Sequence, residues 1–216
     1  MLAIHHPLSA GESVLIGLVV AVIVMVPLVS APAQHLWRMT HEGAHALLAV
    51  ILGLTVTEIV LDRHANGKTS IVGEGLRVVL VVLIGYLGPS LFGVGAARLI
   101  ALGYPIAVLW LLVVLLVGVL FLLRRSFGLL SVPFAIVLLY LIIRYSHGGA
   151  ETVAAYALTW LLLVAGVRAA AAHSIRSSEA QSLSGRTHLP PHLWALVWLL
   201  GTLAALVIGG KLLIAG

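Results

Sequence analysis

Apolar runs of about 20 residues follow one another along most of this chain, and a run of that length can cross a bilayer as a helix. Seven such runs are recognisable. They cover residues 13–30, 34–54, 76–102, 105–123, 127–143, 152–167 and 193–214. Because backbone polar groups inside a bilayer must be satisfied within their own segment, each run is expected to be helical. The sequence thus predicts an all-α multi-pass membrane protein with about seven transmembrane helices.

The composition favours the same class. Hydrophobic residues make up 62% of the 216 residues and charged residues 9%, whereas soluble domains carry about 25% charged residues. A soluble domain of this size keeps much of its surface in water and could not cover so much apolar material. The net charge of +5 would suggest nucleic acid as the partner of a soluble protein. Here the basic residues lie in short connections between apolar runs, so we expect a lipid bilayer and no nucleic acid. We predict one integral-membrane domain over residues 1–216.

The basic residues of these connections are unevenly divided between the two sides of the membrane. With the N-terminus inside, the inner connections hold eight Lys and Arg residues and the outer ones three. The inner set is Arg63, Lys68, Arg77, Arg124, Arg125, Arg168, Arg176 and Arg186, and the outer set is Arg98, Arg144 and Lys211. Since cytoplasmic loops carry the excess of Lys and Arg, we expect a cytoplasmic N-terminus. One span more or fewer would reverse this orientation.

Two inner connections are long enough to have structure of their own. In the first, residues 55–61 and 68–72 are rich in β-branched residues, and Asn66-Gly67 between them is a strong turn signal. We therefore predict a short β-hairpin directly after the second apolar run. The second connection, residues 168–192, is polar and is predicted to be irregular.

The second apolar run contains His41-Glu42-Gly43-Ala44-His45, an HExxH motif. Histidines four residues apart lie on one face of a helix, so both imidazoles can bind one zinc ion. Glu42 then lies beside the water that the zinc activates and can take its proton. The chain has no Cys, so every metal ligand must offer nitrogen or oxygen.

The position of the motif in the membrane adds to its meaning. Ionisable residues inside a span are costly and mark a functional site by default. At 1.5 Å per residue the motif lies roughly 10–17 Å from the start of its helix, where a metal could reach a peptide bond within the membrane. The alternative is that the histidines only line a polar seam between helices. We expect Zn²⁺ as the cofactor, His41 and His45 as metal ligands, and Glu42 as the catalytic residue.

Several stretches resemble the site-2 protease family of intramembrane zinc metalloproteases, in particular its compact bacterial members without a PDZ domain. HEGAHALLAVILG is similar to the family's HExxH helix, and the predicted hairpin occupies the place of its membrane-associated β element. GYLGPSLFG, residues 85–93, resembles the Gly-Pro segment of the following helix, although Phe92 stands where the family often has Asn. SEAQSL, residues 178–183, is similar to an SDA-like segment of related compact proteins. The resemblance implies a bacterial cell membrane and a membrane-spanning or membrane-anchored protein substrate.

The third metal ligand departs from the family pattern. A catalytic zinc usually has three protein ligands, and in the family the third is an Asp of an LDG-type motif, which this chain lacks. Glu179 is the candidate, because it replaces the Asp of the SDA-like segment and glutamate binds zinc in His₂Glu sites. Alternatively, Glu179 is a solvated loop carboxylate paired with Arg176 or Arg186. His173 or His188 could then complete the site.

The motif and the resemblance together predict a zinc metalloendopeptidase that hydrolyses peptide bonds of membrane-embedded or membrane-anchored substrates. Two other functions would use the same residues. A non-enzymatic metal-binding scaffold or carrier on the same fold would account for the missing LDG motif, although a carrier is expected to have ionisable residues on several spans. A zinc hydrolase of a lipid or other small membrane substrate would share the zinc-water chemistry.

Overall fold

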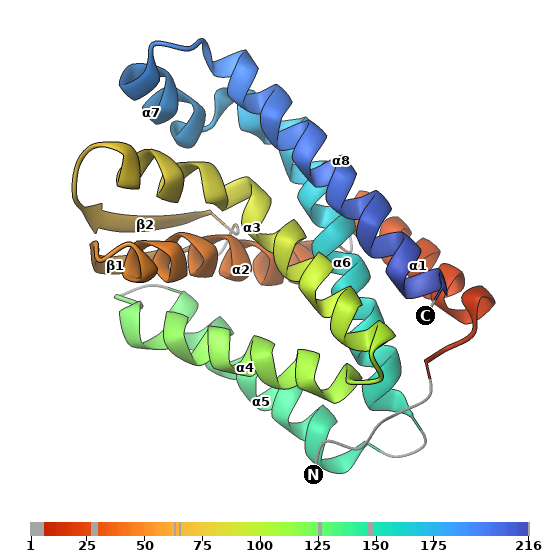
Figure 1. The fold of residues 1–216 in the computed structure, drawn as a ribbon. Coiled ribbons are helices and arrows are strands. Elements are labelled where there is room, and N and C mark those ends of the chain that lie inside the picture. The colour runs from red at the N-terminus through yellow and green to blue at the C-terminus, as the bar shows by residue number, and fades with distance from the viewer. Residues whose placement is uncertain are drawn as a thin grey trace.

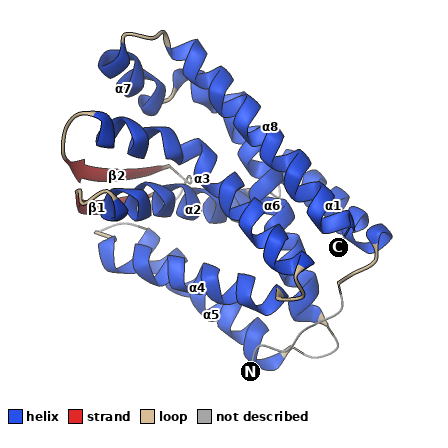
Figure 2. Cartoon of the chain, viewed as in Figure 1, coloured by secondary structure: helices blue, strands red, loops and turns tan. Residues whose placement is uncertain are grey.

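The structure is a computed structural model that describes residues 7–26, 30–62, 64, 66–124, 127–146 and 149–215, with the side chain of His173 left out. The elements follow in the order α1 (Ala10–Met25), α2 (Ala31–Ile51), β1 (Thr55–Leu61), β2 (Gly67–Val72), α3 (Leu76–Ala101), α4 (Pro105–Leu122), α5 (Gly128–Tyr145), α6 (Ala150–His173), a 3-10 turn (Ser174–Arg176), α7 (Ser178–Thr187) and α8 (Pro191–Ala215). Figures 1 and 2 show a helical assembly with the small hairpin at one end.

Each of the seven predicted apolar runs contains a helix, namely α1 to α6 and α8. Among the described residues, five of these helices (α3, α4, α5, α6 and α8) are long and apolar enough to cross a membrane. α1 has only 16 residues, and the polar residues of the motif make α2 less apolar than the other runs. The helical membrane fold with a hairpin is confirmed, whereas the number of seven spans is not.

The first two helices follow one another and do not lie side by side. α1 runs along α6 in the same direction, because Leu8 N donates to the Tyr156 hydroxyl (3.2 Å) and, further along both helices, Trp160 Nε1 donates to Ser13 Oγ (3.4 Å). α2 then continues from the end of α1 toward the hairpin (Figure 1). The expected cytoplasmic N-terminus depends on two separate crossings in this region, so it stays a prediction.

The hairpin that follows α2 is confirmed. β1 and β2 pair antiparallel, with Leu61 opposite Gly67. Gly67 is therefore the first residue of β2 and not a turn residue. In the loop before it, the Asp62 carboxylate accepts hydrogen bonds from the backbone N–H groups of His64 (2.8 Å) and Asn66 (2.9 Å). Such side-chain bonds to the following backbone are typical of turns that begin with Asp.

The connection between α6 and α8 is helical, so the prediction of an irregular segment over residues 168–192 is wrong. α6 continues to His173, and α7 begins where the Ser177 side chain accepts a hydrogen bond from Ala180 N (3.1 Å). This N-cap satisfies a donor that every helix start leaves without an intrahelical partner. α7 ends at Thr187, and the residue that follows it, His188, caps the helix with a φ of +60°.

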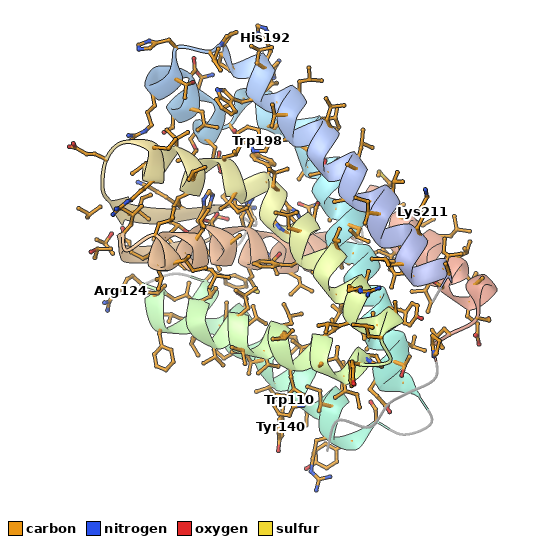
Figure 3. The ribbon with its side chains drawn as sticks, in the orientation of Figure 1. Trp110, Arg124, Tyr140, His192, Trp198 and Lys211 are labelled. Atoms are coloured by element: carbon orange, nitrogen blue, oxygen red, sulfur yellow. The ribbon has the colours of Figure 1, made fainter. Side chains whose placement is uncertain are left out.

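α3 lies between α2 and α8 and forms one wall of the site described below (Figure 1). Small residues allow the close contact, since a Cβ atom at Gly88 would collide with Ala44 of α2. On its other side, Trp198 of α8 is fully buried and donates a hydrogen bond from Nε1 to the Leu83 carbonyl (2.8 Å). Figure 3 shows Trp198 on the side of α8 that faces α3. These contacts tie three helices together around the motif.

Candidate metal centre

The HExxH motif lies in the middle of a continuous α2 and is buried. The helix begins with Pro32 in its first turn, where a missing N–H removes no intrahelical bond. His41 is 0% exposed, Glu42 1% and His45 7%. Because the helix is unbroken through the motif, the two imidazoles lie one turn apart on the same face.

Three of the predicted site residues come together in space. One donor atom each from His41, His45 and Glu179 can be chosen so that all lie within 4.8 Å of one another. His41 Nε2 is 3.2 Å from His45 Nε2 and 3.2 Å from Glu179 Oε1. Glu179 lies in the first turn of α7, so the helix that the sequence does not predict carries the third member of the cluster.

The spacing of these donor atoms suits a tetrahedral metal ion. Zinc binds imidazole nitrogen at about 2.0–2.1 Å and carboxylate oxygen at about 2.0–2.2 Å, which sets neighbouring donors about 3.3 Å apart in a tetrahedron. Both separations measured from His41 Nε2 are 3.2 Å. Two imidazoles and one glutamate are also the ligand set of the His₂Glu catalytic zinc sites. The residues present therefore fit a divalent metal ion.

The charge state of Glu179 agrees with a ligand role. Burial acts to raise the pKa of this carboxyl, but its contact with His41 outweighs burial, and the pKa lies below its ordinary value. The side chain is 18% exposed, at the edge of the buried cluster. The ionised carboxylate is the form that binds metals.

His45 is oriented by the backbone of α3. Its Nδ1 lies 2.6 Å from the Val81 carbonyl oxygen. A carbonyl only accepts, so Nδ1 carries the hydrogen and the lone pair of Nε2 is left for a metal. Metal-binding histidines usually have such a second hydrogen bond. Gly85 provides the space, because a Cβ atom there would lie 2.5 Å from His45 Nε2 and 2.9 Å from His41 Cε1.

His41 is held by aromatic rings. Its ring centroid lies 4.9 Å from that of Trp37 and 5.2 Å from that of Tyr86, the latter edge-on. Tyr86 in turn contacts Trp198 at 4.7 Å. The Nδ1 atom of His41 is buried and has no hydrogen-bond partner among the described residues. Side chains from α2, α3 and α8 thus fix this imidazole by packing, in contrast to His45.

Glu42 is not a member of the His41–His45–Glu179 cluster. It accepts a hydrogen bond from Thr69 Oγ1 of β2 (2.7 Å), and Arg38, one turn earlier on α2, lies 3.6 Å from its other oxygen. Gly67 of β2 passes so close that a Cβ atom there would collide with the carboxylate. The hairpin therefore covers Glu42 and sets its position beside the cluster.

A polar cavity of about 640 Å³ lies beside the His41–His45–Glu179 cluster and is partly open to the surface. Its walls come mainly from α2, the hairpin loop, α6 and the start of α7. Its polar lining consists of Ser30, Gln34, Trp37, Arg38, His64, Asn66, Tyr86, Arg168, Arg176, Ser177, Ser178 and Glu179. Because Glu179 lies on its wall, the cavity offers water a route to the cluster.

The alternatives for the third ligand occupy different places. Glu179 forms its ion pair with His41. Among the described residues, no ion pair joins Glu179 to Arg176 or Arg186. His188 is exposed at the end of α7, outside the cluster. The side chain of His173 lies outside the part of the chain that the structure describes.

Some residues that shape the site are not predicted from the sequence, namely Arg38, Thr69, Val81 and Tyr86. The spacing of Arg38 to Glu42 is i to i+4, which is a recognisable pattern for an ion pair on a helix. The other three contact the motif from β2 and α3, and no local pattern marks them.

Comparison with known proteins supports this description. A family model described as Peptidase M50B-like matches residues 14–209, which include the motif, the hairpin and α7. Searches among curated proteins and among solved structures found no match. The family is of the site-2 protease kind, whose members are metal-dependent membrane proteases, so the resemblance seen in the sequence is confirmed. The chain belongs to the Peptidase M50B-like family.

Proposed function

We propose that this protein is an intramembrane zinc endopeptidase in which His41, His45 and Glu179 bind the metal and Glu42 is the catalytic base. The observation that carries the proposal is the convergence of three donor atoms from α2 and α7. A buried His₂Glu cluster in a helical membrane protein, beside a polar cavity, has the ligands and the water access that hydrolysis needs.

The mechanism follows from the surroundings of Glu42. A zinc ion at the cluster would polarise the scissile carbonyl and lower the pKa of a water to about 7. Glu42 takes the proton of the attacking water and passes it to the leaving nitrogen. Thr69, at 2.7 Å, and Arg38, at 3.6 Å, keep the carboxylate in one orientation during this transfer.

β2 is the element best suited to hold the substrate chain. The outer edge of β1 is occupied, because Arg124 N donates to the Ile59 carbonyl (3.0 Å) and Leu123 bridges to the same residue. The outer edge of β2 has no strand partner among the described residues. A substrate segment that unwinds from a helix can add to this edge in extended form. Thr69 of β2 bonds Glu42, so the added segment would lie close to the base.

The substrate is a membrane-spanning or membrane-anchored polypeptide. Five helices of membrane-spanning length accompany the site in the part of the chain that the structure describes, and soluble proteins would have to enter the bilayer to reach it. We also propose that the hairpin end faces the cytoplasm of a bacterial cell, because most of the basic connections lie there. Figure 3 shows Arg124 at that end and Lys211 at the other.

A carrier is the main alternative, and the distribution of ionisable groups disfavours it. A transport path requires polar or charged residues along its length. Among the described residues, the buried charged and histidine side chains are His41, Glu42 and His45, which form one local group. A lipid hydrolase would use the same cluster, but the free β2 edge favours an extended peptide.

Cleavage of a single-span model protein in liposomes tests the proposal. Wild-type protein should cleave it, a chelator should stop the reaction and zinc should restore it. Glu42→Gln should keep the metal and lower the rate by at least about 10²- to 10⁴-fold, the usual contribution of a general base. Glu58→Gln on β1 is the matched control and should cleave normally. Full activity of Glu42→Gln, or of chelated wild type, would contradict the proposal.

A further inference from the structure

The polar cavity beside the His41–His45–Glu179 cluster carries an excess of positive charge. Three arginines line it, Arg38 from α2, Arg168 from α6 and Arg176 from the 3-10 turn. Of the described residues that line it, Glu179 alone is acidic, and it belongs to the cluster with His41 and His45. A bound divalent metal would make the cavity more positive still. The cavity is therefore suited to an anionic ligand.

Two of these arginines lack a carboxylate partner among the described residues. The ion pairs found there join Arg38 to Glu42 and a motif histidine to Glu179. Neither includes Arg168 or Arg176. Arg168 is half-buried on α6, where a partly desolvated charge without a counter-ion is unfavourable. A guanidinium group can donate two parallel hydrogen bonds to one carboxylate, which makes a carboxylate its best partner.

The start of α7 adds to the positive potential. Ser177, its N-cap, and Ser178, its first residue, both line the cavity. The N-terminus of a helix carries partial positive charge and N–H groups without intrahelical partners. The volume of about 640 Å³ falls within the range of about 300–1,000 Å³ that is usual for ligand sites.

The cavity also continues the proposed substrate path. His64, Asn66 and Gly67 of the hairpin lie on its wall, and Gly67 is the first residue of β2. A chain that adds to the outer edge of β2 therefore leads into the cavity. This continuity favours a part of the polypeptide substrate as the occupant over a lipid headgroup.

We propose that the cavity binds carboxylates of the substrate polypeptide close to the segment that is cleaved. The inference rests on the proposed function and adds a substrate class. Preferred substrates carry Asp or Glu side chains, or a free C-terminal carboxylate, near one end of their membrane segment. Arg168 and Arg176 are the residues that select them, with Arg38 shared between the cavity and Glu42.

Binding of synthetic peptides tests this selection without requiring cleavage. Each labelled peptide has one apolar membrane segment flanked at either end by Asp-Asp, Asn-Asn or Lys-Lys. Its affinity for the detergent-purified Glu42→Gln protein is measured by fluorescence anisotropy. We expect the Asp-Asp peptide to bind about tenfold more tightly than the Asn-Asn peptide, as for one charge-assisted pair, and the difference to shrink at high salt. Peptides ending in a carboxylate or an amide separate the two sources of the carboxylate.

Arginine variants test which residues distinguish acidic peptides from neutral ones. Arg168→Gln and Arg176→Gln, each in the Glu42→Gln background, should bind Asp-Asp and Asn-Asn peptides equally, with the Asn-Asn affinity unchanged. Arg168→Glu should prefer the Lys-Lys peptide. Arg98→Gln is the matched control, because Arg98 is exposed in the last turn of α3 and does not line the cavity. Arg176 is exposed on the 3-10 turn, so its variant tests the proposal even if Arg168→Gln does not fold.

Three outcomes would overturn the proposal. The first is equal affinity of the unsubstituted cavity for Asp-Asp and Asn-Asn peptides, and the second is full discrimination in both Arg→Gln variants. The third is discrimination that disappears in phosphatidylglycerol nanodiscs but persists in phosphatidylcholine nanodiscs, which would identify the cavity as a lipid-headgroup site. Failure of the proposed function looks different, because a protein that neither holds zinc nor cleaves can still discriminate between these peptides.

Discussion

Two hollows flank α2, and their linings are opposite in character. On one side lies the polar cavity of about 640 Å³, which Trp37 and Arg38 of α2 line. On the other lies a groove of about 750 Å³ bounded mainly by α2, α3 and α4, with Gly43, Leu47 and Val50 as the α2 residues among its apolar lining. The same helix thus separates a water-accessible site from a surface suited to hydrocarbon.

The difference follows from helical periodicity. Arg38, His41 and His45 recur at intervals of three or four residues and form one stripe, while Gly43, Leu47 and Val50 form another. A polar stripe cannot face lipid without a large cost, so it must face the protein interior or water. The polar stripe of α2 carries two members of the candidate metal site, His41 and His45, whereas the other stripe contributes to an apolar groove suited to lipid.

A pair of glycine substitutions on α3 tests this division with the largest expected effect. Gly85→Ala would place a Cβ atom 2.5 Å from His45 Nε2 and should lower metal affinity about 10- to 100-fold, as changes around metal ligands usually do. Gly95→Ala on the groove side meets nothing within 4 Å and should leave the affinity unchanged. Competition with a zinc-binding dye measures both. Equal losses in the two variants would mean that the sides of α2 are not independent.

A pair of threonine substitutions in the hairpin separates catalysis from metal binding. Thr69→Val removes the hydrogen bond to Glu42 (2.7 Å) and should lower kcat by at least about tenfold, since such bonds to charged groups contribute about 1.5–3 kcal/mol. Thr57→Val removes an exposed bond to the Ser70 carbonyl and should have little effect. Metal content should stay normal in both. A loss of metal in Thr69→Val would show that the hairpin supports the ligands and not only the base.

Cysteine labelling compares water access on the two sides. The chain has no Cys, so single cysteines can be introduced directly. Ser178→Cys in the polar cavity should react with a charged maleimide several times faster than Gly118→Cys in the groove, where nothing lies within 4 Å of an added Cβ. Similar rates at both positions would contradict a water-filled polar cavity.

The same approach decides the topology, with the smallest structural disturbance. An added Cβ at Gly11 or Gly185 meets nothing within 4 Å. If α1 and α2 together make one crossing, Gly11→Cys and Gly185→Cys should be labelled from opposite sides of the membrane, with Gly185→Cys on the cytoplasmic side. Labelling of both from the cytoplasm would instead support two crossings and the expected cytoplasmic N-terminus.

Local sequence signals predict those parts of the molecule that depend on neighbouring residues. The hairpin is predicted because residues 55–61 and 68–72 are β-branched and flank a turn signal. The spacing of His41 and His45 predicts their common face. α7 is not predicted, although Ser177 before Ser178-Glu179 is a recognisable helix start. The polar composition of residues 168–192 favours an irregular segment, and this signal is stronger than the helix-start signal of a single N-cap.

Contacts between distant segments are beyond such signals. The Val81 carbonyl that orients His45 has no side-chain signature at all, and the space at Gly85 depends on how closely α3 approaches α2. Glu179 is proposed as a ligand from a resemblance, and its 3.2 Å distance to His41 depends on the path of α7. The end-to-end arrangement of α1 and α2 likewise follows from the packing of α1 against α6, which the hydropathy of the sequence does not predict.

Metal content of the detergent-purified protein tests the central claim most directly. Wild type and Glu42→Gln should each hold about one zinc per chain, whereas His41→Ala and Glu179→Ala should lose it, because a catalytic site needs three protein ligands. Elemental analysis after gel filtration gives the ratio, and circular dichroism confirms that each variant is folded. Full zinc in folded Glu179→Ala, or none in wild type, would contradict the His41–His45–Glu179 site.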